Sequence, residues 1–532
     1  MKYLSLFRSA VILAVFVGLC AITLHACRAP QREVRRPNIL LCLADDISYP
    51  HMGAYGTSWV VTPAFDRVAR EGLLFDNFYT PNAKCSPSRS CLLTGRNSWQ
   101  LEEAANHWPA FPQKFKVYTE VLEENGYFVG YTGKGWAPGQ AGEIEGRPRL
   151  LTGLPFNEKT TVPPATHISL NDYAGNFEAF LNARPAGMPF CFWYGSTEPH
   201  RAYEFQAGIK QGGKKLADID RVPEFWPDND TVRTDMLDYA FEIEYFDLHI
   251  QRMLDILDRR GELSNTLVIV TSDNGMPFPR VKAQTYEYSN HMPLAIMWHE
   301  GMGRPGRSVT DPVSMIDLAP TFLDLAGIDA GESGMQPMAG LSMEKLLTNG
   351  TAMPRDYLLL GKERHDIGRP GDAGYPMRAI LQDGFLYIRN YEPDRWPSGN
   401  PETGYLAADG SPTKTWILND RRSRGQSDYW RMNFGRRAQE ELYFIPDDPG
   451  CLQNLALSGD YTSRIESMRS RMEAGLRKEG DPRMEGRGHL FDEYAYTDLR
   501  NKDFYTRYMA GEEGLTAGWV EPGDFEPEPI GQ

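Results

Sequence analysis

The stretch NILLCLADD, residues 38–46, decides the fold class. Its apolar run is uninterrupted, which is typical of a strand buried on both faces of a parallel sheet. The run ends at Asp45 and Asp46, and a later stretch, LVIVTSDNG at residues 267–275, has the same form. Ligands bind beyond the carboxyl ends of the strands in such sheets. The sequence therefore predicts a functional site where these two strands end.

Amphipathic segments separate the predicted strands. Apolar side chains recur at helical spacing over residues 232–260, and Gly261 follows as a C-cap. Thr62 and Pro63 form a helix start. This alternation predicts an α/β fold, in which helices flank a large, mostly parallel β-sheet. The predicted helices cover residues 62–71, 118–125 and 232–260, and further strands cover 127–131 and 189–194.

The first 27 residues have the form of an export signal. Lys2 and Arg8 precede an apolar run at 10–24, which is shorter than the roughly 20 residues that a spanning helix needs. The letters LHAC, ending at Cys27, resemble a lipobox, in which Cys27 is lipidated and becomes the mature N-terminus. The alternative is an ordinary cleaved signal peptide. Either predicts an exported protein, periplasmic or anchored to the membrane as a lipoprotein.

The rest of the chain is expected to form two folded parts. A short charged linker, residues 28–36, leads into the major domain, residues 37–370. Short strands near 379–380, 385–388 and 442–445, with a helix near 461–478, predict a smaller C-terminal α+β subdomain over 371–510. Residues 511–532 are rich in Gly, Pro and Glu, and this composition predicts a flexible tail.

The acidic balance of the chain limits its partners. The formal net charge of −15 argues against a nucleic-acid-binding protein, which needs a basic surface. It does not exclude an anionic substrate, because salt screens fields beyond about 10 Å and a few cations can dominate one pocket.

The strongest chemical signal is the sequence CSPSR at residues 85–89, followed by LTGR at 93–96. Alone, Cys85 could equally be a buried structural cysteine in a turn. Asp45, Asp46, Asp273 and Asn274 change that balance, because their hard oxygen atoms suit Ca²⁺ or Mg²⁺ rather than Zn²⁺. Two such groups at two strand ends are harder to explain as helix caps alone.

This combination resembles the sulfatase family, formylglycine-dependent enzymes of the alkaline phosphatase superfamily. The resemblance implies that a maturation enzyme oxidises Cys85 to formylglycine, whose hydrated aldehyde attacks sulfur. It also implies one Ca²⁺ ion, and a sulfatase domain over residues 37–370. The implied metal ligands are Asp45, Asp46, Asp273, Asn274 and the formylglycine at position 85.

The resemblance also assigns four cationic or titratable residues to the pocket. Arg89 and Lys134 would hold the nucleophile, and Lys282 would bind the sulfate oxygens. His200, with Lys282, would protonate the leaving group. For each residue alone, a solvated surface charge or a satisfied histidine is the alternative.

The chain departs from the family at one position. The family sequence Lys-x-His is here Lys134-Gly135-Trp136. The missing histidine normally contacts the formylglycine and assists breakdown of the sulfated intermediate. Three replacements are open, namely His51, His107 or water.

Sequences typical of the sulfamidase (heparan N-sulfatase) branch occur at residues 273–279, 199–201 and 375–378. They imply a sulfated saccharide substrate, and they leave O-sulfate and N-sulfate open. His107, Arg364 and His365 are the predicted sugar-binding residues, with a surface loop as the alternative for the last two. A phosphomonoester or phosphonate hydrolase would normally have Thr or Ser as nucleophile, or extra His ligands for two zinc ions. A non-catalytic glycan-binding lipoprotein would have no need for Cys85.

Overall fold

The computed structural model describes residues 36–530. The predicted signal peptide, Cys27 and nearly all of the linker lie outside the described residues. The chain divides into residues 1–36 and a compact unit, residues 37–532, and the description below concerns the second unit. Within residues 36–530 no helix combines the length and the apolar character that crossing a membrane requires.

The major sheet has eight strands in the order β11-β2-β10-β9-β1-β8-β4-β7. The central strands β9, β1, β8 and β4 are parallel, whereas β10 runs antiparallel to its neighbours β9 and β2. The predicted α/β class with a mostly parallel sheet is confirmed. The strands are β1 Asn38–Ala44, β2 Leu73–Phe75, β4 Phe128–Gly133, β7 Leu154–Pro155, β8 Phe190–Gly195, β9 Thr266–Ser272, β10 Leu294–Met297 and β11 Arg307–Val309.

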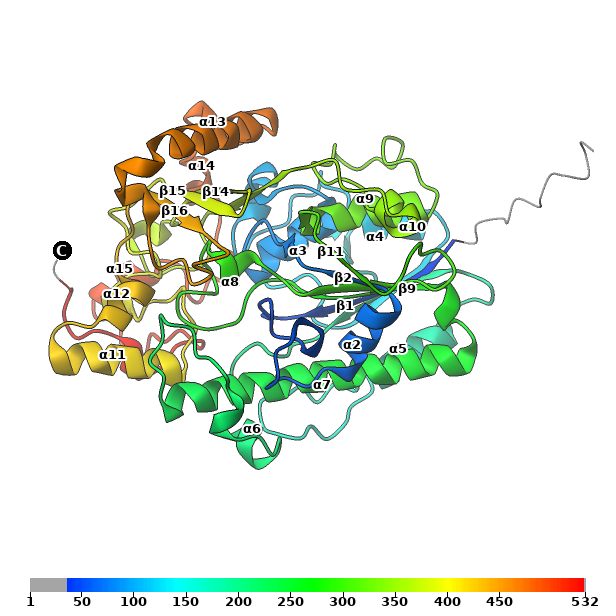
Figure 1. Cartoon of the computed structure of the whole chain (residues 1–532), viewed down its shortest axis with the longest axis horizontal. Helices are drawn as coiled ribbons and strands as arrows, with labels where there is room; N and C mark the ends of the chain where they lie inside the picture. The colour runs from blue at the N-terminus through cyan, green and yellow to red at the C-terminus, as the bar shows by residue number, and fades with distance from the viewer. Residues whose placement is uncertain (1–35, 531–532) are drawn as a thin grey trace, which may run out of the picture. The chain divides into compact units, whose positions relative to one another are not determined.

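Helices cover both faces of this sheet (Figure 1). Alternate residues of a strand point to opposite faces. Leu40 accordingly packs in the core beneath α2, α5 and α7, while Leu41 packs in the core beneath α3, α4, α9 and α10. The helices of the first face are α2 Pro63–Glu71, α5 Tyr173–Ala183 and α7 Asp230–Arg260. Those of the second are α3 Cys85–Thr94, α4 Tyr118–Glu124, α9 Leu318–Leu325 and α10 Glu344–Asn349.

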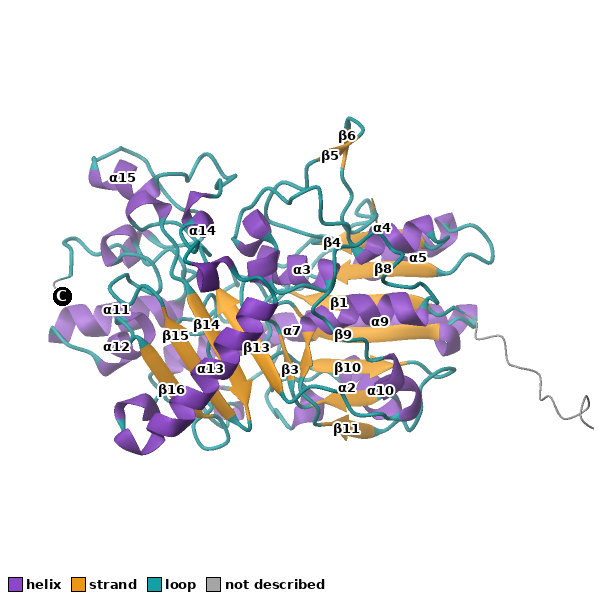
Figure 2. Ribbon diagram, turned by 90° about the horizontal axis from the view of Figure 1, so that it is seen from above, coloured by secondary structure: helices purple, strands orange, loops and turns teal. Residues whose placement is uncertain are grey.

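A second, antiparallel sheet has four strands in the order β13-β14-β15-β16 (Figure 2). Helix α13, Thr462–Lys478, packs its apolar side chains against one face of this sheet. Strand β13 belongs here although it precedes the boundary expected near residue 371, because the sequence does not reveal which sheet an apolar run joins. The strands are β13 Tyr357–Lys362, β14 Met377–Gln382, β15 Phe385–Asn390 and β16 Glu440–Phe444.

The segment 511–530 differs from the expected flexible tail. Asp524 is buried and forms an ion pair of 3.0 Å with Lys414, whose side chain is also buried. Glu526 accepts a hydrogen bond of 3.1 Å from Nε of Arg422. Composition alone suggested disorder, but the acidic side chains of this segment pair with bases of α11, Pro412–Arg424.

Short elements connect these layers. They are β3 Phe78–Tyr79, β5 Glu143–Ile144, β6 Arg147–Pro148, β12 Val313–Ser314, α6 Ala207–Lys210, α8 Glu287–Asn290, α12 Asp428–Phe434, α14 Leu490–Glu493 and α15 Phe504–Met509.

Candidate active site

The predicted acidic residues meet where β1 and β9 end. Ala44 pairs with Ser272 in the sheet, so the residues that follow these two strands lie side by side. Asp46 has a left-handed backbone, with φ of 83°, and its N–H donates to Oδ1 of Asp273 at 3.2 Å. One carboxylate oxygen from each of Asp45, Asp46 and Asp273 lies within 4.8 Å of the others. All three side chains are buried.

Asn274 completes a set of oxygen donors that fits a divalent cation. Its Nδ2 donates to Oδ1 of Asp46 at 2.6 Å. Its Oδ1 is buried and accepts no hydrogen bond from the residues that the structure describes. A buried carbonyl oxygen without a donor calls for a partner, and three neighbouring carboxylates make a hard cation the fitting one. The residues present therefore fit the predicted metal site.

The carboxylates of this site differ in their electrostatics. Although burial opposes it, Lys134, His200 and Arg89 together hold the pKa of Asp45 well below its usual range. For Asp273, burial outweighs Arg89 and raises the pKa. Burial of several acids in one place destabilises their charged forms unless cations compensate. The protein supplies some of those cations itself.

Helix α3 begins at Cys85 and is buried along its whole length. The thiol Sγ lies 3.4 Å from Oδ1 of Asp45. Burial and the charge of Asp45 raise the pKa of this thiol, so it stays protonated and is a poor nucleophile in its unmodified form. The helix ends at Thr94 and is capped by Gly95, whose left-handed φ of 66° explains the glycine in LTGR.

Arg89 lies one turn further along α3 and joins three elements. Its Nε donates to Oδ2 of Asp273 at 2.8 Å, and its Nη2 lies 3.5 Å from Oδ1 of Asp45. Its Nη1 donates to the carbonyl oxygens of Lys134 and Gly135, each at 2.8 Å. The side chain is fully buried. Arg89 thus fixes α3 against the ends of β4 and β9.

Lys134 reaches the site from the end of β4. Its Nζ lies 2.5 Å from Oδ2 of Asp45. The backbone at this point passes very close to β8, since a Cβ atom on Gly195 would lie 1.8 Å from the carbonyl oxygen of Lys134. Gly133 has a φ of 75° and makes a similar close approach. The two glycines therefore allow the crossing that positions Lys134.

Lys282 lies between two carboxylates. Its Nζ is 2.6 Å from Oδ2 of Asp46 and 2.9 Å from Oδ2 of Asp409. Despite burial, Lys282 and Lys84 hold the pKa of Asp409 well below its usual range. Sequence reasoning missed Asp409, because it lies in a loop before α11 and has no local pattern that would mark it.

His200 follows β8 and is half-buried at the same site. Its Nδ1 lies 2.7 Å from the carbonyl oxygen of Arg201. Since that carbonyl can only accept, Nδ1 carries the hydrogen and Nε2 is left for other partners. A ring nitrogen of His200 lies within 4.8 Å of Cys85 Sγ and a carboxylate oxygen of Asp45. Burial and Lys282 lower the pKa of the imidazole.

Trp136, at the position of the family histidine, belongs to the core. Its Nε1 donates to Oγ of Ser90 on α3 at 2.8 Å, and its ring packs edge-on against Phe111. Nδ1 of His51 lies 3.3 Å from the hydroxyl oxygen of Tyr239, and the His51 side chain is buried. The cluster of Asp45, Cys85 and His200, whose ligand atoms lie within 4.8 Å of one another, includes neither His51 nor His107.

A second buried polar cluster lies next to Cys85. Nζ of Lys84, the residue before α3, is 2.6 Å from Oδ2 of Asp366, and Nδ1 of His107 is 2.9 Å from the other oxygen. Nε2 of His365 lies 2.6 Å from Oδ1 of Asn82, and its Nδ1 has no hydrogen-bond partner within residues 36–530. Sequence reasoning missed Lys84 and Asp366, since neither has a recognisable spacing.

Arg364 is used differently from the predicted sugar contact. It is 2% exposed, and its Nη2 donates to the carbonyl oxygens of Tyr494 at 2.8 Å and Ala495 at 3.2 Å. These bonds fasten a C-terminal loop beside the site. They favour a structural role for Arg364, and a role in substrate binding stays a prediction.

The arrangement fits a hydrolase for anionic esters, because Cys85 at a helix start, a group of hard oxygen donors and flanking cations lie together. A sequence model of the family described as Sulfatase matches residues 37–328, more than half of the chain. The chain belongs to the sulfatase family and is a hydrolase of sulfate esters or N-sulfates. This family is generally dependent on formylglycine and a divalent metal, and the match favours sulfate over the phosphate and phosphonate alternatives.

Named relatives cover most of the chain. Human N-sulphoglucosamine sulphohydrolase is 28% identical over 488 residues, which are 85% of this chain and 92% of the relative. An ulvan-active sulfatase of Formosa agariphila is 25% identical over 526 residues, which are 87% of this chain and 80% of the relative. A solved structure with bound D-glucosamine-2-N,6-O-disulfate superposes with a TM-score of 0.59 at 20% identity. The superposition covers 84% of this chain and 98% of the other, and it supports the fold.

Proposed function

We propose that this chain removes sulfate from a sulfated glucosamine-type sugar, with Ca²⁺ and a formylglycine made from Cys85. The observation that carries the proposal is the placement of Cys85, which starts a fully buried helix with its sulfur 3.4 Å from Asp45. The sugar class rests on the human relative's name, N-sulphoglucosamine sulphohydrolase, and whether the bond is S–O or S–N is left to the experiment.

The metal would be held by Asp45, Asp46, Asp273 and Asn274, together with the modified position 85. Oxygen donors in this number suit Ca²⁺, which accepts six to eight ligands in flexible geometry. When bound, the cation polarises a sulfate oxygen and favours an ionised nucleophile. The thiol of Cys85 in the structure stands in for the formylglycine, whose hydrated aldehyde supplies the attacking oxygen.

The protein's own cations position the reaction. Lys134, 15% exposed, lies against Asp45 and can bind the oxygen at position 85. Lys282 is buried between Asp46 and Asp409 and keeps its charge, so it can balance the sulfate oxygens. Arg89 holds α3 and Asp273 in place, and its Nη2, which has no hydrogen-bond partner within residues 36–530, is proposed to help hold the nucleophile at position 85.

His200 donates the proton to the departing oxygen or nitrogen, with Lys282 beside it. Its Nδ1 is committed to the carbonyl of Arg201, so Nε2 is the atom that serves the leaving group. The negative charge of a bound sulfate favours the protonated ring. His51, His107 and water remain the candidates for the task of the histidine replaced at Trp136, and His107 and His365 remain proposed sugar contacts.

We also propose an exported enzyme, matured by a formylglycine-generating partner and attached to the membrane, if at all, only through a lipid at Cys27. The proposed N-terminal parts are the signal at 1–27 and the linker at 28–36, which lead into the catalytic domain that begins at residue 37.

A panel of defined substrates tests the function. Sulfate release is measured from glucosamine N-sulfate, glucosamine 6-O-sulfate, other sulfated monosaccharides and an aryl sulfate. The proposal expects turnover of a sulfated glucosamine that far exceeds turnover of sulfated galactose or uronic acid. Equal turnover of all sugars, or turnover of phosphate esters alone, would contradict it.

A further inference from the structure

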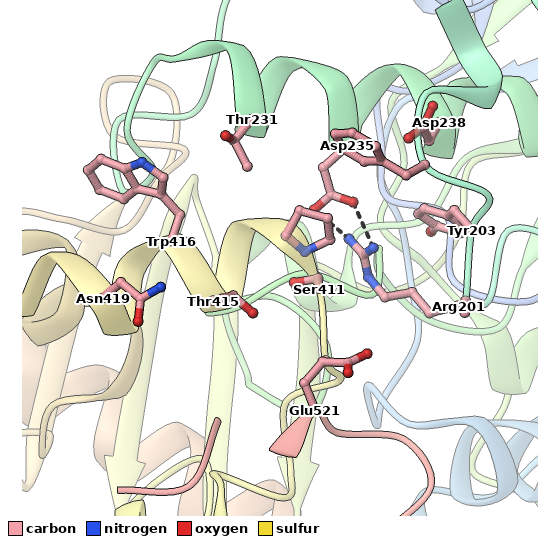
Figure 3. A pocket seen from close by; sticks show the side chains of 14 residues that line it. Arg201, Tyr203, Thr231, Asp235, Asp238, Ser411, Thr415, Trp416, Asn419 and Glu521 are labelled. Atoms are coloured by element: carbon pink, nitrogen blue, oxygen red, sulfur yellow. Dashed lines mark hydrogen bonds and ion pairs between the residues drawn. The ribbon is translucent and has the colours of Figure 1, made fainter. Parts of the chain in front are cut away.

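A pocket of about 520 Å³ lies between α7 and α11 (Figure 3). Helix α7 contributes Thr231, Asp235 and Asp238 from one side. Helix α11 contributes Thr415, Trp416 and Asn419 from the other. None of these residues takes part in the proposed chemistry.

The pocket adjoins the chemistry through the backbone. His200 and Asp409 face each other, with a ring nitrogen of one within 4.8 Å of a carboxylate oxygen of the other. The residues that follow them, Arg201 and Gly410, both line the pocket. Consecutive Cα atoms are about 3.8 Å apart. The pocket lining is therefore adjacent along the chain to His200 and Asp409, two residues of the candidate site.

The lining suits a sugar ring. Trp416 is half-buried, and Phe205, which is 54% exposed, belongs to the same lining. Aromatic faces carry partial negative charge and attract the C–H bonds of a pyranose face. Thr415 and the exposed Asn419 offer neutral hydrogen-bonding groups for hydroxyls. A few polar groups around an apolar surface are typical of small-ligand sites.

The formal charge of the pocket disfavours acidic sugars. Its lining has one base, Arg201, and three acids, Asp235, Asp238 and Glu521, so its formal charge is +1 − 3 = −2. Arg201 is committed to Asp235, with Nη1 2.7 Å from Oδ1 (Figure 3). Glu521 is exposed and faces the pocket without a basic partner in its lining. A second sulfate or a carboxylate would be repelled here.

We propose that this pocket binds the sugar next to the sulfated ring, and that it selects a neutral or amino sugar over a uronic acid or a sulfated one. The inference rests on the proposed function and adds the identity of the neighbouring ring. Binding energy from that ring raises kcat/KM for a longer substrate.

Two disaccharides that differ only in the second ring test the proposal. One has a neutral hexose next to the sulfated glucosamine, and the other has the corresponding hexuronic acid. The wild-type enzyme should turn over the neutral one at least tenfold faster in kcat/KM. Trp416→Ala should lower kcat/KM on the neutral disaccharide about tenfold and leave an aryl sulfate unchanged, while Trp416→Phe retains most of the turnover. Glu521→Gln should reduce the preference against the uronic acid.

Controls separate the pocket from stability and from the proposed function. Leu457→Ala, at a side chain that is 81% exposed and outside the pocket lining, should change turnover of neither substrate. Titration calorimetry with the neutral disaccharide lacking its sulfate measures binding to the pocket when no hydrolysis can occur. Binding that Trp416→Ala weakens supports the pocket even if no sulfated sugar is a substrate. Equal losses on the disaccharide and the aryl sulfate, or disaccharide binding that ignores Trp416, would overturn the proposal.

Discussion

The two sides of the candidate active site are built differently. On one side, Asp45, Asp273 and Lys134 follow strands of the major sheet, and Cys85 starts a buried helix. On the other side, Asp409 and Asp366 come from loops of the C-terminal half. Strand ends fix the first group to one another through sheet register, whereas loops can vary without moving the sheet. The difference suggests that the sheet side performs the common chemistry and that the loop side, apart from Asp409 at Lys282, selects the substrate.

The largest effect is expected for Asp273→Ala on the sheet side. The change removes a proposed metal ligand and leaves Arg89 buried without its 2.8 Å partner. Removing one partner of a buried ion pair costs about 3–5 kcal/mol. Sulfate release should fall to background, and the free energy of unfolding should fall by about that amount, measured by urea denaturation.

Asp258→Ala is the matched control for this variant. Asp258 is half-exposed and pairs with Arg67 at 3.1 Å. An exposed pair contributes about 0–1 kcal/mol. If both variants lose the same free energy of unfolding and the same activity, Asp273 has no role in metal binding or in holding Arg89, and the prediction is wrong.

Chelation should produce the next largest effect. Exhaustive removal of divalent cations should abolish sulfate release and lower Tm, because a ligand at about 100 times its Kd stabilises the folded state by about 2.7 kcal/mol. Ca²⁺ should restore both. Scanning calorimetry with and without Ca²⁺ measures the stabilisation by the metal independently of activity. Restoration of activity and Tm by Zn²⁺ alone would contradict the assignment of oxygen-donor ligands.

Asp409→Asn tests whether one loop residue belongs with the chemistry. Lys282 would lose one of its two carboxylate partners and be less well positioned for the sulfate oxygens. We expect kcat to fall about tenfold or more on aryl sulfate and sugar substrates alike, equivalent to about 1.4 kcal/mol. A loss confined to sugars would place Asp409 with substrate selection.

Much of the sheet side could be predicted from the sequence, and the reasons are physical. An uninterrupted apolar run such as residues 38–44 can form a doubly buried strand, and its end is where ligands bind. The spacing of Cys85 and Arg89 places both on one helix face. Asp409 and Lys84 could not be predicted, because long-range packing brings them to Lys282 and Asp366. Strand β13 and the packed segment 511–530 depend on the same kind of contact.

His365→Ala should have the smallest and most selective effect. The side chain is buried against Asn82. Its Nδ1 has no hydrogen-bond partner within residues 36–530 and is the atom placed to meet a substrate hydroxyl directly or through water. We expect kcat/KM on the preferred sugar to fall about tenfold, with aryl sulfate hydrolysis nearly unchanged. Equal losses on both would move His365 to the chemistry, and no loss would leave it a packing residue.

The central claim is that Cys85 becomes the nucleophile at the metal site. The most direct test is peptide mass spectrometry of the segment containing Cys85, taken from enzyme whose sulfate release has been measured. Across preparations with different degrees of maturation, activity should rise in proportion to the fraction of position 85 present as formylglycine, and Cys85→Ala should be inactive. Full activity in a preparation whose Cys85 is entirely unmodified would contradict the account.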